Sequence, residues 1–134
     1  MLKRSAALAL CLLGLLAVPA EAGLTIFHSP SDNIGCALGG FGARCDVADH
    51  TWVAPPKPKS CDLDWGGGVA VDKKGKAGYV CAGDTTLHQG NALAYGHSVI
   101  QGRFKCTSKQ SGMKCFNKRN DHGFFVSRST VRLF

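Results

Sequence analysis

Apolar residues recur at every second position on both sides of a glycine-rich centre in the stretch 34–47, IGCALGGFGARCDV. If Cys36 and Cys45 face each other across an antiparallel hairpin, every residue on their face is apolar, and residues 39–42 form the turn. Directly opposed strand residues also have the Cα separation that a disulfide can bridge. The pattern therefore predicts a stapled hairpin. Its other face, expected to be open to solvent, carries Gly35, Ala37, Arg44 and Asp46.

The stretch 103–118, RFKCTSKQSGMKCFNK, repeats this pattern with the same cysteine spacing. Pairing Cys106 with Cys115 places a turn near residues 110–112 and puts Phe104, Ser108, Met113 and Asn117 on the cystine face. The other face is then basic with one aromatic ring. It carries Arg103, Lys105, Thr107, Lys109, Lys114, Phe116 and Lys118.

Three further segments complete the expected framework. A third hairpin is predicted over residues 69–81 around a Lys-Gly turn. Residues 122–134 predict a terminal pair of strands, because the apolar parity switches near Arg128. The proline-rich segment 54–59 is expected to be an extended spacer rather than a ligand for an aromatic groove, and residues 29–33 a turn.

The first 22 residues have the features of a secretory signal peptide. A basic start precedes an apolar run over residues 6–20 that is too short to span a bilayer, and a small-x-small site follows before Gly23. A lipoprotein would need a cysteine directly after this run, whereas Cys11 lies inside it. We therefore expect cleavage near Ala22/Gly23, soluble export to the periplasm or the exterior, and a single mature domain over residues 23–134.

Cleavage removes Cys11 and leaves six cysteines, an even number that implies three disulfides in an exported chain. Other connectivities exist, but the two hairpins favour Cys36–Cys45 and Cys106–Cys115, and elimination then leaves Cys61–Cys81. Metal or redox chemistry is the disfavoured alternative, because no Cys-x-x-Cys or zinc-knuckle spacing occurs. We expect no metal and no cofactor.

The fold class follows from these elements. Glutamate is absent after Glu21, which argues against long amphipathic helices. The sequence predicts an all-β fold: a small, disulfide-stapled antiparallel domain, sandwich or barrel-like, built from hairpins.

The charge is strongly basic. The chain has 16 basic and 9 acidic residues, a net charge of +7, and loss of Lys3, Arg4 and Glu21 leaves 14 and 8, a net charge of +6. A basic exported protein can meet nucleic acid, wall polymers or acidic lipid surfaces, and the simpler alternative is that the charge serves solubility.

Candidate catalytic groups are scattered along the chain. Asp84 and Asp121 lie near histidines in sequence, but no spacing brings two histidines together, and no hydrolase or phosphate-loop motif occurs. Trp52 and Trp65 fit sugar stacking or, as we prefer, core packing. The five histidines are His28, His50, His88, His97 and His122.

The stretches FHSPSDNIGC, ARCDV, CDLDWG, YVCAGDT, GRFKCTS and HGFFVSR resemble a family of small exported cysteine-rich bacterial proteins catalogued as a domain of unknown function. The resemblance runs from Phe27 to Phe134. It implies an exported, disulfide-bonded single domain, with glycine expected in relatives where Asp32 stands here. It implies no activity, cofactor or catalytic residue.

These observations predict a secreted, non-enzymatic and monomeric binding module for polyanions or a cell-surface polymer. The predicted binding residues are Arg103, Lys105, Lys109, Lys114, Phe116 and Lys118. The alternatives are a small extracellular hydrolase or nuclease-like toxin that uses His and Asp, and an inhibitor that inserts the loop 39–42 or 72–76 into a secreted enzyme. A pocket that joins His with Asp would favour the enzyme, and a flat basic or aromatic face would favour the binder.

Mass spectrometry of the secreted protein should show a chain that begins near Gly23 with all six remaining cysteines oxidised, because both the leader and the cysteine count require it. Free thiols in the native protein, or retention of Cys11, would contradict the assignment to an oxidising compartment.

Overall fold

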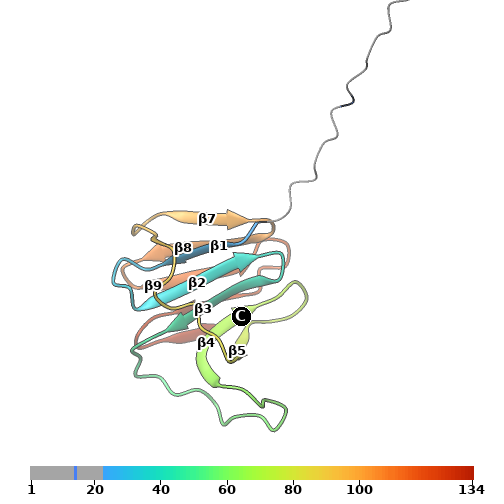
Figure 1. Ribbon diagram of the computed structural model, residues 1–134, viewed down its shortest axis with the longest axis vertical. Helices are drawn as coiled ribbons and strands as arrows, with labels where there is room; N and C mark the ends of the chain where they lie inside the picture. The colour runs from blue at the N-terminus through green and yellow to red at the C-terminus, as the bar shows by residue number, and fades with distance from the viewer. Residues whose placement is uncertain (1–13, 15–22) are drawn as a thin grey trace, which may run out of the picture.

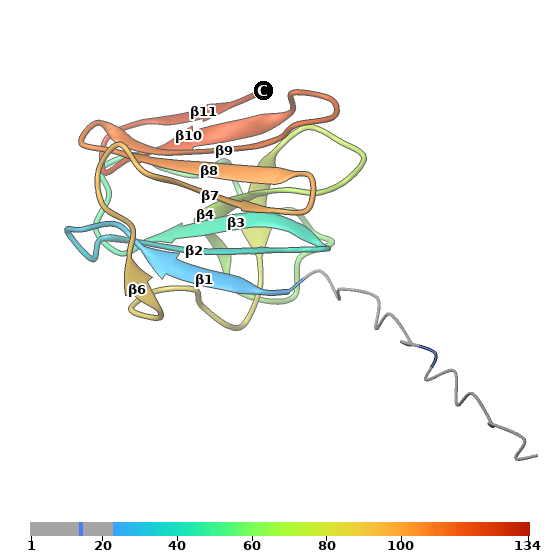
Figure 2. The same ribbon diagram turned by 90° about the horizontal axis from the view of Figure 1, so that it is seen from above.

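The computed structural model describes Gly14 and residues 23–134, so the predicted signal peptide lies, apart from Gly14, outside the described residues. The described residues form eleven strands in two sheets and contain no α-helix. The sheets lie face to face, as the two layers in Figure 2 show, and this confirms the all-β prediction in its sandwich form. Within the described part of the chain, no helix is long and apolar enough to cross a membrane.

The first sheet has six strands in the order β5-β4-β3-β2-β1-β6 (Figure 1). Neighbouring strands are antiparallel, except that β6 runs parallel to β1. The strands are β1 (Thr25–His28), β2 (Ile34–Gly39), β3 (Gly42–Val47), β4 (Trp65–Val71), β5 (Gly78–Cys81) and β6 (Asn91–Ala92).

The second sheet has five strands in the order β11-β10-β9-β8-β7, all antiparallel to their neighbours. These strands are β7 (Ser98–Gln101), β8 (Phe104–Lys109), β9 (Gly112–Asn117), β10 (Gly123–Val126) and β11 (Val131–Leu133). The predicted terminal pair is β10 and β11, with the break at residues 127–130.

The hairpin registers match those expected from the sequence. Cys36 lies opposite Cys45 in the β2–β3 hairpin, and Cys106 lies opposite Cys115 in the β8–β9 hairpin. Each pair is joined by a disulfide across a Cα separation of 4.1 Å. The third disulfide, Cys61–Cys81, ties the segment before β4 to the end of β5.

The two hairpin disulfides meet between the sheets. The Sγ atoms of Cys45 and Cys115 are 3.6 Å apart, and both cystines are fully buried. Because all these sulfurs are oxidised, the contact is van der Waals packing rather than a thiolate site for a metal. The largest fully buried apolar side chains of the surrounding core are Phe104, Phe124, Leu38, Met113, Val69 and Val126.

The second face of the β2–β3 hairpin is not open to solvent, which corrects the sequence-based expectation. The segment 82–90 lies across it, and Thr86 of this segment packs against β2 at Gly35, where the absence of a side chain permits the close approach. A Cβ at position 35 would lie 2.2 Å from the carbonyl oxygen of Thr86. Alternation along two strands predicts which residues share a face, but not whether a distant segment covers that face.

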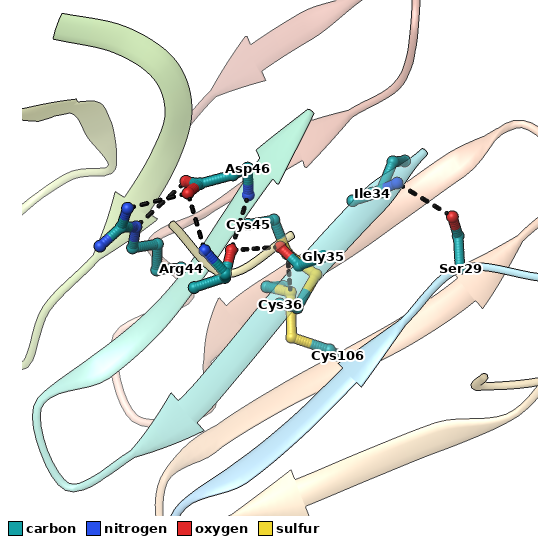
Figure 3. Close-up of a disulfide and its surroundings, with 10 residues drawn as sticks. Ser29, Ile34, Gly35, Cys36, Arg44, Cys45, Asp46 and Cys106 are labelled. Atoms are coloured by element: carbon teal, nitrogen blue, oxygen red, sulfur yellow. Dashed lines mark hydrogen bonds and ion pairs between the residues drawn. A yellow bond between two sulfur atoms is a disulfide. The ribbon is translucent and has the colours of Figure 1, made fainter. Parts of the chain in front are cut away.

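Asp46 anchors this covering segment. Its Oδ2 accepts hydrogen bonds from the backbone N–H of Thr86 (3.0 Å), the hydroxyl of Thr85 (3.2 Å) and Nη2 of Arg44 (2.8 Å). Figure 3 shows Arg44 and Asp46 joined in this way. Asp84, at the start of the segment, accepts a further bond from Nη1 of Arg44 at 2.7 Å. The Asp84-Thr85-Thr86 stretch therefore serves structure.

Two groups of this network have shifted pKa values. Burial opposes the charge of Arg44, but the hydrogen bonds that its guanidinium donates to Asp46 and Asp84 outweigh this effect, so the pKa of Arg44 lies above its ordinary value. The Arg44 guanidinium lowers the pKa of Asp84 through a hydrogen bond and charge attraction. The Arg44 guanidinium is paired with both carboxylates, at 2.8 Å to Asp46 and 2.7 Å to Asp84, so its charge is compensated within the protein.

Adjacent glycines in β4 test this packing. Gly68→Ala should lower the thermal midpoint, at a cost of about 1–3 kcal/mol, because the added Cβ would lie 2.1 Å from Oδ1 of Asp46 and 2.5 Å from the carbonyl of Cys45. Gly67→Ala is the matched control, since its Cβ meets nothing within 4 Å. Equal thermal midpoints for the two variants would show that the covering network or the register of β4 is wrong.

Candidate polyanion-binding face

Charge is divided unequally between the two parts of residues 23–134. Residues 23–97, which include the six-stranded sheet, carry six basic and seven acidic residues. Residues 98–134, which form the five-stranded sheet and its loops, carry eight basic residues and one acidic residue, Asp121. Asp121 lies in the loop between β9 and β10, so no strand of this sheet carries an acidic side chain. The positive charge of the protein is concentrated on one layer of the sandwich.

Basic and aromatic side chains alternate on the outer face of the five-stranded sheet. Lys114 lies between Thr107 and Phe125 across β8, β9 and β10, and Phe125 lies opposite Arg132 of β11. In the neighbouring row, Lys105 lies opposite Phe116. The cystine fixes this arrangement, because residues next to Cys106 and Cys115 must point to the other face.

The cations of this face lie over its aromatic rings. Nζ of Lys114 is 5.3 Å from the ring centroid of Phe116 and 5.8 Å from that of Phe134, and Cζ of Arg132 is 4.5 Å from that of Phe125. Such contacts orient cations without neutralising them, since a ring carries no net charge. Their charge therefore remains available to an anion.

A hollow of about 510 Å³ opens on the same layer. Three cations, four hydroxyl groups and two aromatic rings contribute to its lining, and none of the described lining residues is acidic. Cations and hydroxyl donors are the groups that bind phosphate and sulfate oxygens. The lining residues are Lys109, Lys114, Arg132, Ser111, Ser127, Ser129, Thr130, Phe125 and Phe134.

The residues predicted from sequence occupy this layer in two ways. Lys105, Lys109, Lys114 and Phe116 belong to β8 and β9, whereas Arg103 and Lys118 lie just beyond the ends of these strands, joined by a backbone hydrogen bond of 2.7 Å. The sequence did not point to three further residues of this layer: Phe125 of β10, Arg132 of β11 and Phe134, the residue after β11. Alternation along β10 shows that Phe124 and Phe125 point to opposite faces. The pairing of Phe125 with Lys114 of β9 is needed to show that Phe125 is the one on the outer face.

A second hollow, of about 690 Å³, lies at one end of the sandwich and contains a histidine and an aspartate. Nδ1 of His88 is 2.8 Å from Oδ2 of Asp32, and Nδ1 of His28 is 3.6 Å from its Oδ1. Asp32 and His88 are 56 residues apart in the chain, so sequence spacing could not reveal their pairing. The structure thus combines a basic aromatic face with a pocket that joins His and Asp.

Both tryptophans are used in packing. Each is partly buried, and the indole N–H of Trp52 donates to the carbonyl of Ser127 and that of Trp65 to the carbonyl of Pro55, both at 2.8 Å. His50 stacks on Trp52 with ring centroids 3.6 Å apart. Buried aromatic rings with satisfied polar atoms stabilise the loop before β4 rather than offer a sugar platform.

The fold and its three disulfides define a small cystine-stapled β sandwich, and such disulfides indicate an oxidising compartment. The chain belongs to DUF6636, a family of unknown function, whose model matches residues 7–134. No curated protein and no solved structure matched the chain in the comparisons.

Proposed function

We propose that this protein is an exported binding module that recognises polyanions with the outer face of its five-stranded sheet. The observation that carries the proposal is the hollow lined by Lys109, Lys114 and Arg132 together with serine and threonine hydroxyls. Export is supported by the three disulfides and by the leader-like composition of residues 1–22.

The geometry suits a chain of anions better than one small ion. Lys105 and Lys114 lie on adjacent strands, and Lys109 and Arg132 extend the cationic area toward the hollow, so several phosphates or sulfates can be neutralised together. Each neutralised group releases condensed counterions, which makes binding tight at low salt and steeply dependent on salt. Phe116 and Phe134 add apolar contact beside the cations.

Retention on an immobilised polyanion across a salt gradient tests the proposal. Lys105→Glu/Lys114→Glu should elute at clearly lower salt than the wild type, because the double substitution removes two cations and adds two repelling charges on the face. The control is Lys57→Glu/Lys59→Glu, which changes the net charge equally at two exposed positions of the proline-rich segment that do not line the hollow.

Both variants should keep the thermal midpoint of the wild type within a few degrees, since all four lysines lie at the surface or at its edge. Elution of the two double mutants at the same salt concentration would show that bulk charge accounts for retention, and the proposed face would then not be a site.

A further inference from the structure

The turn between β1 and β2 holds Asp32 rigidly. Its backbone N–H donates to the carbonyl of Ser29 at 2.8 Å, and the Ser29 hydroxyl accepts from the backbone N–H of Ile34 at 3.1 Å (Figure 3). The neighbouring Asn33 exchanges two hydrogen bonds with the backbone of Asp49, at 2.8 and 3.0 Å. Asp32 itself has a positive φ of 58°, a conformation that costs energy for a residue with a side chain.

The covering segment 82–90 presents His88 to this carboxylate. His88 also has a φ of 58°, and its segment is fixed by the Thr86 hydroxyl, which donates to the carbonyl of Gly35 at 2.6 Å. Because a carboxylate only accepts hydrogen bonds, Nδ1 of His88 carries the hydrogen in its 2.8 Å bond to Asp32. The lone pair of the neutral imidazole is therefore on Nε2, which is the arrangement of an oriented general base.

Stability does not account for this pair. The side chains of Asp32 and His88 are 48% and 60% exposed, and ion pairs at such positions contribute little to folding. Oδ1 of Asp32 is buried and accepts no hydrogen bond from the described residues, with Nδ1 of His28 3.6 Å away. Two left-handed residues in contact, with a carboxylate oxygen unpaired, are typical of strain kept for function.

The pair lies beside the proposed binding face. His88 and Asp32 line the 690 Å³ hollow together with Tyr95, Lys109 and Arg128. This hollow and the 510 Å³ hollow share four lining residues, so they adjoin. The shared residues are Lys109, Ser111, Ser127 and Ser129. A polyanion bound on the sheet can continue past Lys109 toward the imidazole.

We infer that His88 is the general base of a site that cleaves single-stranded RNA. RNA is the polyanion that carries its own nucleophile, so one oriented base next to a bound phosphate is enough to begin the reaction. The inference rests on the proposed polyanion-binding face, which would bind the RNA strand. It favours the nuclease-like alternative over the non-enzymatic module that the sequence analysis expected.

The reaction balances without an added co-reactant. Nε2 of His88 takes the proton of a ribose 2′-hydroxyl, the 2′-oxygen forms a bond to the adjacent phosphorus, and the bond from phosphorus to the 5′-oxygen breaks. The products are a 2′,3′-cyclic phosphate and a 5′-hydroxyl, whose proton comes from water, and His88 returns its proton to water. Lys109 and Arg128 supply positive charge for the phosphorus centre. Asp32 is a positioning residue that holds the tautomer of His88.

The experiment measures cleavage of an end-labelled single-stranded RNA by the disulfide-intact protein, with a DNA strand of the same sequence as the substrate that lacks the nucleophile. The wild type should produce 2′,3′-cyclic phosphate ends from RNA and leave DNA intact. His88→Asn should reduce the cleavage rate by at least about 100-fold. Asparagine tolerates a positive φ, so the turn is kept.

Three comparisons separate the possible outcomes. His88→Asn should elute from the polyanion column with the wild type, Asp32→Asn should lower the rate and alter its dependence on pH, and His97→Asn, at an exposed position outside the hollow, should change nothing. Cleavage by His88→Asn at the wild-type rate would overturn the inference. A wild type that is retained on the polyanion but leaves RNA intact would overturn it and spare the binding proposal, whereas failure of both retention and cleavage would overturn both.

Discussion

The contact between two disulfides at the centre of the sandwich determines which side chains of the two hairpins face the core and which lie on the outer faces of the sheets. Each of these disulfides, Cys36–Cys45 and Cys106–Cys115, joins directly opposed residues of one hairpin, and the two meet at 3.6 Å between the sheets. A shift of one residue in either hairpin would exchange its buried and exposed faces, which the covalent bond forbids. The side chains next to the cysteines are therefore committed to the two outer faces.

The two outer faces differ in whether their cations are paired within the protein. We assign a structural role to the face with paired cations and a candidate binding role to the other. On the six-stranded sheet, Gly35 allows the segment 82–90 to lie against the strands, and the carboxylates of Asp84 in this segment and Asp46 in β3 neutralise Arg44 within the protein. On the five-stranded sheet no described segment supplies acidic partners, and Lys114 and Arg132 lie over aromatic rings instead. Of the cations that lie on described strands, those of the second sheet remain available to an external anion, whereas Arg44 of the first sheet is paired.

The sequence allowed the hairpins, their registers and the basic face of β8 and β9 to be predicted, because these depend on pairing between adjacent strands. It did not show that Gly35 lies beneath a distant carbonyl, nor that β10 and β11 bring Phe125 and Arg132 next to Lys114. The pairing of Asp32 with His88 was equally hidden, since it requires the connection from β5 to β6 to pass beside the β1–β2 turn, 56 residues earlier in the chain. Local patterns specify neighbours along a hairpin, whereas packing between distant segments decides which polar groups remain free.

The central claim is that the cystine-fixed outer face of the five-stranded sheet is where polyanions bind. A titration of the isotopically labelled protein with a short single-stranded DNA, followed by nuclear magnetic resonance, tests it most directly, because DNA carries the phosphates but lacks the 2′-hydroxyl that would permit cleavage. The account predicts that the largest shifts, reduced by added salt, fall on Lys105, Lys109, Lys114, Phe116 and Arg132. Shifts confined to the six-stranded sheet or the proline-rich segment, or an absence of shifts at low salt, would contradict it.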